Sequence, residues 1–574
     1  MKLLLQYLKP YRIFIIITLI TKISGTLVEL AIPYILSYII DSVVPTHRVS
    51  LVVFWGVMMI FCALCALVLN IWANRFAVRV ARSTTEQIRS KLFESTMRLS
   101  SRQIDEFTVP SLESRLTSDT YNIHSFVGFT MRMGVRAPIL LFGGIAVTAF
   151  LEPVLTLVMV TIIPFIGLVV WLITKKGIPL FKKAQRSVDR MVGVVREDTQ
   201  GIRVIKALSK NDYECRRYDE ANRNLASDEK KAEYVMSASN PSVTFLLNAG
   251  LVSVIVVGAW RVMGGVMLPG KIIAFMQYFT LISNAMIGVT KIFVNYSKGS
   301  ASADRISAVI NTEPDFAVAS ENLYPVRGDN AHIVFENVSF SYKKVKNNIE
   351  NISFRLKKGQ TLGIIGATGS GKTTILQLLM RNYDVDSGSI RIDGRDLRTI
   401  PAEELRAKFG TAMQNDFIFS ASAAENIKFG RDISDEDMEK AAESACALEF
   451  INAYPDRFEH KFTSKGTNIS GGQKQRIFIA RAIAAKPEIL LLDDSFSALD
   501  YKTDSAVRRI LRENLAGTTT IVVAQRVSSV MNADLILVLD EGRIIGSGTH
   551  DELIESCKVY RQISESQTGG AILD

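Results

Sequence analysis

Residues 362–374 read Leu-Gly-Ile-Ile-Gly-Ala-Thr-Gly-Ser-Gly-Lys-Thr-Thr, and this stretch decides the fold of the C-terminal half. Residues 362–365 are apolar enough for a buried strand, and the apolar spacing after Thr374 is that of a helix. Between them stands the pattern G-x-x-x-x-G-K-[ST]. Its glycines let backbone N–H groups approach phosphates, and the helix N-terminus adds its dipole. The stretch therefore predicts a phosphate-binding loop inside an α/β domain.

The polar residues of this loop have predictable roles. Lys372 supplies a positive charge to the β- and γ-phosphates, and the Thr373 hydroxyl is a ligand for Mg²⁺. A second apolar strand, residues 489–493, ends in Asp493, which it would place beside Mg²⁺; the alternative is an ordinary core strand. The expected cofactors are therefore ATP and Mg²⁺. The loop residues expected to bind the nucleotide are Gly366, Thr368, Gly369, Ser370, Gly371, Lys372, Thr373 and Thr374.

The composition points to a second, apolar half. The chain has 574 residues, a net charge of +10, 48% hydrophobic residues and a mean hydropathy of +0.19. Such apolar content excludes a disordered chain, and only 5 cysteines exclude a small disulfide-rich scaffold. The basic charge has two usual meanings, nucleic-acid binding or the cytoplasmic loops of a membrane protein. Because the charge flanks apolar stretches, we favour the second and expect no nucleic-acid partner.

The first 300 residues contain six apolar stretches that are long enough to cross a bilayer as helices. Two long connections between them are rich in Lys and Arg, which marks these connections and both termini as cytoplasmic. The first residues lack the features of a cleaved signal peptide. The six stretches lie near residues 14–40, 51–73, 125–151, 154–174, 242–260 and 272–290.

Four ionisable residues interrupt the stretches, namely Lys22, Glu29, Arg132 and Arg136. Charges inside a membrane are costly and often functional. The basic residues could instead lie near helix ends or in an aqueous cleft. Glu29 lies nearest to mid-span and is the best candidate for a charge that lines a cavity.

Residues 469–476, Ile-Ser-Gly-Gly-Gln-Lys-Gln-Arg, open another predicted helix with small residues. Together with the two motifs above, this stretch resembles the ABC transporters, in particular exporters of the type IV fold. The resemblance covers nearly the whole chain. It implies an all-α membrane domain of six transmembrane helices at residues 1–300 and a linker at 301–329. A C-terminal α/β P-loop ATP-binding cassette domain would follow at 330–574.

The resemblance also implies roles for individual residues. Tyr342 would stack on adenine, and Gln414 would sense Mg²⁺ and face the membrane domain. The segments 112–119 and 201–207 resemble the two coupling helices of the family. The signature residues would act in trans, on the nucleotide site of the opposing subunit, and Asp500 belongs to the following D-loop; the signature residues are Ser470, Gly471, Gly472 and Gln473.

The chain departs from the family at two catalytic positions. The family has Glu after the strand-end Asp, whereas this chain has Asp494, whose carboxylate sits about 1.5 Å further back. The switch His of the family is Gln525 here, which can hydrogen-bond a phosphate but cannot take a positive charge or shuttle a proton. The loss of the Glu and the loss of the His both affect the same catalytic step, the hydrolysis of ATP. We therefore expect a degenerate site that binds ATP and hydrolyses it poorly.

These features favour one subunit of a heterodimeric exporter of hydrophobic drugs or lipids in the plasma membrane, with a cytoplasmic ATP-binding domain. Apart from Ile469 the signature is intact, so it would complete the site of a second half-transporter that carries Glu and His. The other expected partners are the lipid bilayer and a hydrophobic small molecule. Two alternatives stay open: a non-hydrolysing regulatory subunit, which would not need the signature, and a homodimeric lipid or peptide exporter that uses Asp494 as a weak base.

Overall fold

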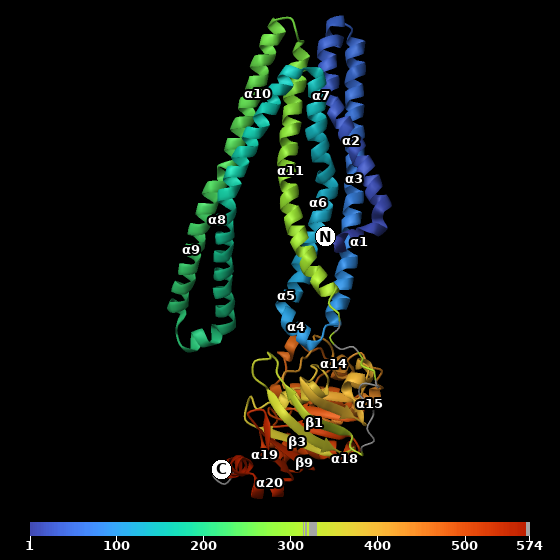
Figure 1. Ribbon diagram of the computed structural model, residues 1–574, viewed down its shortest axis with the longest axis vertical. Helices are drawn as coiled ribbons and strands as arrows, with labels where there is room; N and C mark the ends of the chain where they lie inside the picture. Colours follow the sequence, from blue (N-terminus) through green and yellow to red (C-terminus); the bar gives the residue numbers. More distant parts are fainter. Residues whose placement is uncertain (314, 316–317, 321–329, 570–574) are drawn as a thin grey trace. The chain divides into compact units, whose positions relative to one another are not determined.

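The apolar stretches of the N-terminal half form long helices. The computed structural model describes residues 1–313, 315, 318–320 and 330–569 (Figure 1). Among these, 6 helical segments are long and apolar enough to cross a membrane, as the sequence predicts. They cover Leu3–Thr46, Val49–Met97, Val109–Leu151, Pro153–Ala207, Asn211–Met263 and Pro269–Ile310.

The chain divides into two compact units. The membrane unit comprises Met1–Met97 and Pro110–Thr312, and the α/β unit comprises Arg98–Val109 and Glu313–Asp574. The expected linker at 301–329 begins inside a helix, because the last membrane helix continues to Ile310. Residues 321–329 of that linker lie outside the described residues.

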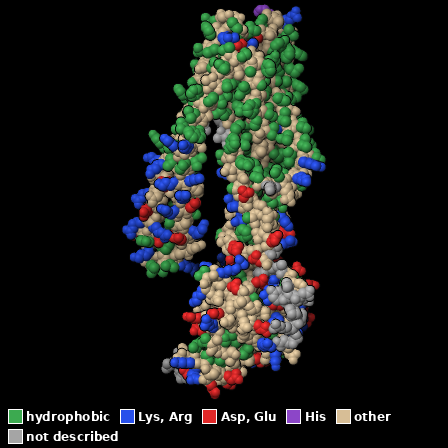
Figure 2. Space-filling model, in the orientation of Figure 1, with side chains coloured by type: hydrophobic (Ala, Val, Ile, Leu, Met, Phe, Trp, Pro, Cys, Tyr) green, Lys and Arg blue, Asp and Glu red, His purple; other side chains and the backbone are tan. Residues whose placement is uncertain are grey.

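The helices of the membrane unit form two groups. One contains α2, α3, α6 and α11, and the other contains α8, α9 and α10, which meets the first through α7 and α11. Figure 2 shows hydrophobic side chains over the spans and many Lys and Arg side chains on the lower part of α8 and α9. The bounds are α1 Lys2–Leu8, α2 Arg12–Tyr38, α3 Val49–Met97, α5 Val109–Ser114, α6 Thr120–Pro138, α7 Gly144–Leu151, α8 Pro153–Ala207, α9 Asn211–Ser237, α10 Ser239–Met263 and α11 Pro269–Ile310.

The α/β unit contains two sheets. The larger has the strand order β10-β9-β3-β8-β7-β6 and is parallel except for β10, so several strand ends meet at one edge. The smaller is antiparallel, with the order β2-β1-β4-β5. The strands are β1 Ile333–Phe340, β2 Ile349–Leu356, β3 Thr361–Gly366, β4 Ser387–Ile392, β5 Arg395–Asp396, β6 Phe409–Ala412, β7 Ile489–Asp493, β8 Thr519–Val523, β9 Leu535–Asp540 and β10 Arg543–Gly548.

Two apolar cores hold this unit together. One fills the space between the two sheets and buries α12 and Leu405 of α13, and the other packs the later helices against the opposite face of the larger sheet. Burial of both faces explains why β7 is apolar throughout. The helices are α12 Lys372–Leu379, α13 Ala402–Ala407, α14 Ala423–Lys428, α15 Asp435–Ser444, α16 Leu448–Asn452, α17 Gly471–Ile483, α18 Tyr501–Asn514, α19 Val527–Val530, α20 His550–Ser556 and α21 Lys558–Gly569.

The two expected coupling segments both lie in the membrane unit. The short helix α4 (Ser101–Phe107) belongs to the α/β unit, where Gln103 donates to the carbonyl of Glu313 at 2.7 Å. Residues 112–119 instead lie in the membrane unit, where Asp119 accepts from Ser302 of α11 at 2.9 Å. The coupling role of 112–119 stays a prediction, whereas α4 packs within the α/β unit itself. The second expected segment, 201–207, forms the last turns of α8.

Candidate functional site

The phosphate-binding loop connects β3 to α12, as predicted. Close packing requires two of its glycines, Gly366 and Gly371. A Cβ on Gly366 would lie 2.1 Å from the carbonyl oxygen of Leu539. Gly371 has φ +97°, and a Cβ there would lie 2.6 Å from Ile349. Only glycine fits such contacts without a shift of the backbone.

Lys372 begins α12 and lies over the loop. Its Nζ donates to the carbonyl oxygens of Gly366 and Ala367, both at 2.8 Å. Burial lowers the pKa of Lys372, against the attraction of Asp493 and Asp494. A phosphate oxygen would restore the favourable environment for its charge, so the lysine fits a polyphosphate ligand.

Asp493 ends β7 and is 1% exposed. Burial raises its pKa, while a hydrogen bond from Thr373 acts in the opposite direction. Its Oδ2 and the hydroxyl of Ser370 are buried atoms without a hydrogen-bond partner in the described part of the chain. A bound Mg²⁺ and a phosphate would satisfy these two atoms. The residues present therefore fit Mg²⁺ and a nucleoside triphosphate, with Thr373, Asp493 and Gln414 as the metal's neighbours.

A cavity of about 220 Å³ joins these groups. Six of the eight predicted loop residues and both degenerate positions line it, although they come from three separate segments; Gly366 and Ser370 are not among its lining residues. Gln414, which follows β6, lines the same cavity. The hydroxyl of Ser495 donates to the carbonyl of Ala412 at 2.7 Å, which holds the end of β6 next to the segment that follows β7. The cavity is lined by Asn348, Thr368, Gly369, Gly371, Lys372, Thr373, Thr374, Gln414, Asp493, Asp494, Val523, Ala524 and Gln525.

The two degenerate residues contact each other. Nε2 of Gln525 donates to Oδ2 of Asp494 at 3.2 Å. Asp494 has φ +50°, and its amide donates to the carbonyl of Val523 at 2.9 Å, which holds it at the end of the sheet. Burial raises the pKa of Asp494. The sequence predicts that both residues lie near the γ-phosphate, but their hydrogen bond could be found only from the structure.

Tyr342 lies at the side of the loop. Its hydroxyl is 3.4 Å from Oγ1 of Thr374, and its ring is 42% exposed, which leaves a face for an adenine base. The ring of Tyr383 packs edge-on against it with the centroids 5.0 Å apart. The hydroxyl of Tyr383 in turn donates to Asp105 of α4 at 2.7 Å. Tyr383 and Asp105 were missed by sequence reasoning, because no local pattern connects them.

The signature residues lie at the start of α17. The hydroxyl of Ser470 accepts from the amide of Gln473 at 3.2 Å, and the Gln473 side chain accepts from the amide of Ser470 at 2.8 Å. This capping box leaves the helix N-terminus, with Gly471 and Gly472, as a site for an anion. These residues are not among those described as lining the loop cavity. Asp500 caps α18 by accepting from the amide of Thr503 at 2.9 Å, and that hydrogen bond lowers its pKa.

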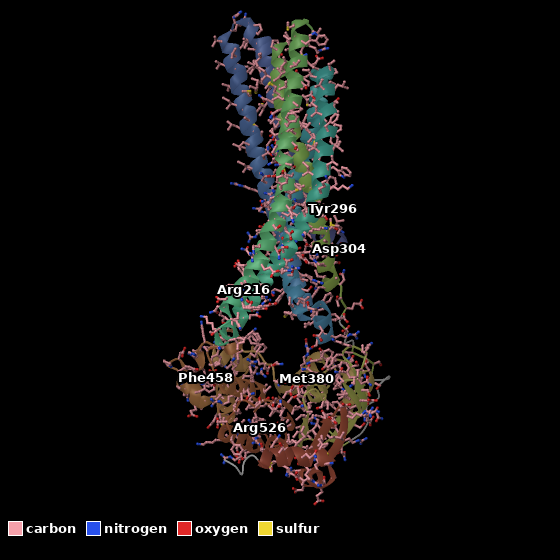
Figure 3. The ribbon with its side chains drawn as sticks, turned by 90° about the vertical axis from the view of Figure 1, so that its left-hand side faces the viewer. Arg216, Tyr296, Asp304, Met380, Phe458 and Arg526 are labelled. Atoms are coloured by element: carbon pink, nitrogen blue, oxygen red, sulfur yellow. The ribbon has the colours of Figure 1, made fainter. Side chains whose placement is uncertain are left out.

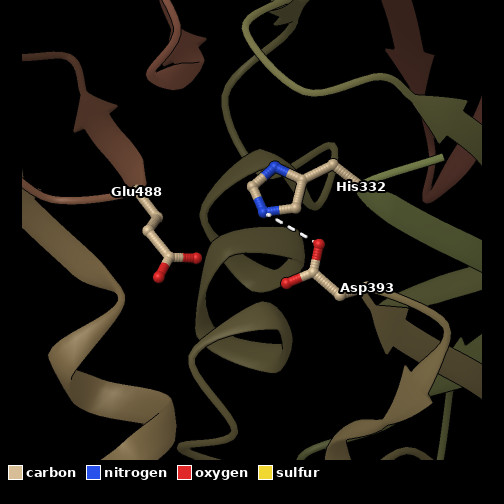
Figure 4. Close-up of side chains that lie close together, drawn as sticks. All are labelled: His332, Asp393 and Glu488. Carbon is tan, nitrogen blue, oxygen red and sulfur yellow. Dashed lines mark ion pairs between the residues drawn. The ribbon is translucent and has the colours of Figure 1, made fainter. Parts of the chain in front are cut away.

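A second cluster of ionisable residues lies at the opposite end of the larger sheet (Figure 4). The side-chain nitrogen or oxygen atoms of His332, Asp393 and Glu488 lie within 4.8 Å of one another. No spacing in the sequence predicts this cluster. Lys408 already lies among them, with Nζ 2.8 Å from Glu488 and 3.5 Å from Asp393. His332 also bonds to Oγ1 of Thr519 at 2.7 Å, and burial lowers its pKa. The lysine charge compensates the carboxylates, so we interpret the cluster as a structural ion-pair network.

Comparisons with known proteins agree with this geometry. The family model "ABC transporter transmembrane region" matches residues 15–286, and the model "ABC transporter" matches residues 349–497. The uncharacterized ABC transporter ATP-binding protein YfiB of Bacillus subtilis is 32% identical over 98% of both chains. Its counterpart Rv1273c of Mycobacterium tuberculosis is 31% identical over 99% of this chain and 98% of its own.

A solved structure shares the fold. The structure of a bacterial Atm1-family ABC exporter with ATP bound superposes with a TM-score of 0.80 over 96% of this chain and 97% of its own, at 24% identity. The chain thus has the fold of an ABC exporter. The chain belongs to the ABC transporter family, as a multi-pass membrane protein with a cytoplasmic ATP-binding domain.

Proposed function

We propose that this chain is one subunit of a heterodimeric exporter of hydrophobic or amphipathic molecules. Its own site binds Mg²⁺ and ATP but hydrolyses ATP poorly. Its signature residues complete the competent site of a second half-transporter, which carries Glu and His at the positions of Asp494 and Gln525.

The observation that carries this proposal is the hydrogen bond between Gln525 and Asp494. A general base must lie within hydrogen-bond reach of the attacking water. Here the shorter carboxylate accepts from an amide that cannot itself relay a proton. The site can therefore hold the phosphates through Lys372 while the residues that would activate water are engaged with each other.

The signature supports the second half of the proposal. Ser470 and Gln473 are arranged as a complete helix cap. A Cβ on Gly472 would lie 3.1 Å from the carbonyl of Ala498, so the glycine keeps the backbone close to the D-loop. A helix start of this kind can bind a γ-phosphate presented by another subunit.

The test compares two substitutions in the complex isolated through a tag on this chain. Asp494→Asn is expected to leave steady-state ATPase activity within about twofold, because this site contributes little turnover. Ser470→Ala is expected to lower the activity about tenfold or more, because a hydrogen bond to a charged phosphate is lost at the partner's site. Ser434→Ala, which removes the equivalent cap of α15, is the matched control and should leave activity unchanged.

Three other outcomes would contradict the proposal. A tenfold loss in Asp494→Asn would favour the homodimer, in which Asp494 acts as the base. Unchanged activity in Ser470→Ala would show that the signature serves no hydrolytic site. A wild-type complex that binds ATP without any turnover would favour the regulatory subunit.

A further inference from the structure

The C-terminal helix α21 supplies a side chain to residues 525–528, which we call the switch segment. Oε1 of Gln567 accepts from the amide of Val527 at 2.8 Å, and its Nε2 donates to the carbonyl of Gln525 at 2.9 Å. One side-chain amide therefore holds the main chain on both sides of Arg526, which Figure 3 labels. Because the amide acts as donor at one end and acceptor at the other, the contact has a single orientation.

These two hydrogen bonds replace a local helix cap. Val527 is the first residue of α19, and the preceding residue, Arg526, makes no side-chain cap. The N–H groups at the start of a helix need acceptors from outside that helix. Gln567 provides one acceptor from a helix that lies 40 residues further along the chain.

The core of the α/β unit sets the position of Gln567. Tyr560, Ile563 and Gln567 are spaced i, i+3 and i+7, so they share one face of α21. Tyr560 is 0% exposed, and its hydroxyl lies 2.8 Å from Nδ1 of His550. Ile563 packs against the same apolar core. The face that packs α21 into the core therefore also carries Gln567.

Two further contacts hold the main chain at either end of the switch segment. The amide of Ala524, which follows β8, donates to the carbonyl of Ile364 at 3.1 Å. At the other end, Arg508 of α18 donates to the carbonyl of Ser528. Gln567 thus holds the middle of a segment whose two ends are attached to different elements.

The switch segment borders an open groove. The groove has a volume of about 1060 Å³, and its lining includes Asp494, Gln525 and Gln567. Because the groove leaves room for the main chain to move, the hydrogen bonds of Gln567 are what keep Gln525 in place. Gln525 also lines the phosphate-binding cavity. Its side-chain amide has two N–H donors, of which one goes to Asp494 at 3.2 Å and the second can donate to a phosphate oxygen.

We propose that Gln567 is a positioning residue of this ATP site, which holds Gln525 where its amide can donate to the γ-phosphate of ATP. This role rests on the proposed binding of ATP at this site and names the residues that recognise the γ-phosphate there. Loss of Gln567 releases the main chain of Gln525. Affinity for ATP should then fall, whereas affinity for ADP, which has no γ-phosphate, should not.

The test measures ATP and ADP binding at this chain alone. Radiolabelled 8-azido-ATP with Mg²⁺ is crosslinked on ice to the complex isolated through a tag, and unlabelled ATP or ADP competes for the label on this chain. Gln567→Met keeps the length of the side chain and removes both hydrogen bonds. It is expected to weaken ATP binding about threefold to tenfold and ADP binding by less than about twofold. Unchanged ATP binding, or an equal loss for both nucleotides, would overturn the proposal.

The matched control is Gln562→Met. Gln562 is exposed on the same helix, so the substitution has the same chemistry without the contact to the switch segment. It should change neither affinity. A loss of ATP binding in Gln562→Met equal to that in Gln567→Met would contradict the assignment to Gln567.

A double-mutant cycle shows whether Gln567 acts through Gln525. Gln525→Ala removes the amide that would meet the γ-phosphate, and it should weaken ATP binding about tenfold. Adding Gln567→Met to this variant should cause no further loss, because the group that Gln567 positions is gone. A further loss of about threefold or more would contradict the proposal.

Hydrogen exchange provides a second measurement, which needs no nucleotide. Exchange in peptides that cover residues 525–530 should become about tenfold faster in Gln567→Met, because the amide of Val527 loses its acceptor. Gln562→Met should exchange as wild type does. Unchanged exchange in Gln567→Met would show that Gln567 does not hold the switch segment.

Neither measurement depends on hydrolysis or on the second subunit. A homodimer in which Gln567→Met weakens only ATP binding would refute the proposed heterodimer and support the role of Gln567. A heterodimer in which Gln567→Met weakens both nucleotides equally would refute the role of Gln567 alone.

Discussion

Replacing Asp494 by Glu and Gln525 by His together is expected to convert this chain's ATP site into a hydrolytic one. Asp494 directly follows β7 at the edge of the cavity, and its carboxylate is held by the Gln525 amide at 3.2 Å. Glu adds one methylene and moves the carboxylate about 1.5 Å further into the cavity. His removes the competing amide and adds a side chain that can carry a proton.

The expected gain follows from the step that is restored. General-base catalysis contributes about 10²–10⁴-fold to a rate, so single-turnover hydrolysis at this site should rise by at least about 10²-fold. The assay crosslinks radiolabelled 8-azido-ATP to the complex and measures the fraction of ADP on this chain over time. Adding Lys372→Ala to the double variant should abolish both the labelling of this chain by 8-azido-ATP and the gain in hydrolysis. A wild-type chain that already forms ADP as fast as the double variant would refute the reasoning.

The remaining predictions concern single residues of the α/β unit. Because burial raises the pKa of Asp493, its ionisation weakens the folded state as pH rises above the ordinary Asp value. Without Mg²⁺ and ATP, Asp493→Asn should therefore raise Tm by about 2 °C or more at pH 7 in a thermal-shift assay, and much less near pH 4. Tyr342→Ala should weaken ATP binding about tenfold in a fluorescence titration, whereas Tyr342→Phe should bind within about twofold of wild type. Tyr383→Phe removes the hydrogen bond to Asp105 and should lower substrate-stimulated ATPase activity at unchanged ATP affinity; unchanged stimulation would show that this contact does not couple α4 to the nucleotide site.

The local motifs were predictable because each is a short pattern with one structural solution. The loop 366–374 needs its glycines and its lysine at fixed spacing, and the strand at 489–493 is buried on both faces. The six spans were predictable because a bilayer demands a minimum apolar length. Glu29 does line a cavity, as its mid-span position indicated.

Contacts between distant segments were not predictable. The partner of Glu29 is Arg136, 107 residues away, and Lys22 donates a hydrogen bond to the side-chain amide of Asn70 on another helix. The membership of α4 in the α/β unit was not predictable either, because only tertiary packing places this short polar helix there. The ion-pair network around His332 joins four segments and has no local signal.

The mass of the intact complex tests the central claim most directly. The complex would be isolated from its native membrane through a tag on this chain and measured by native mass spectrometry. The account predicts two unequal subunits, one of 63.7 kDa before the tag and a second half-transporter with Glu and His in place. Two equal subunits would contradict it, because hydrolysis would then depend on Asp494 and Gln525 themselves.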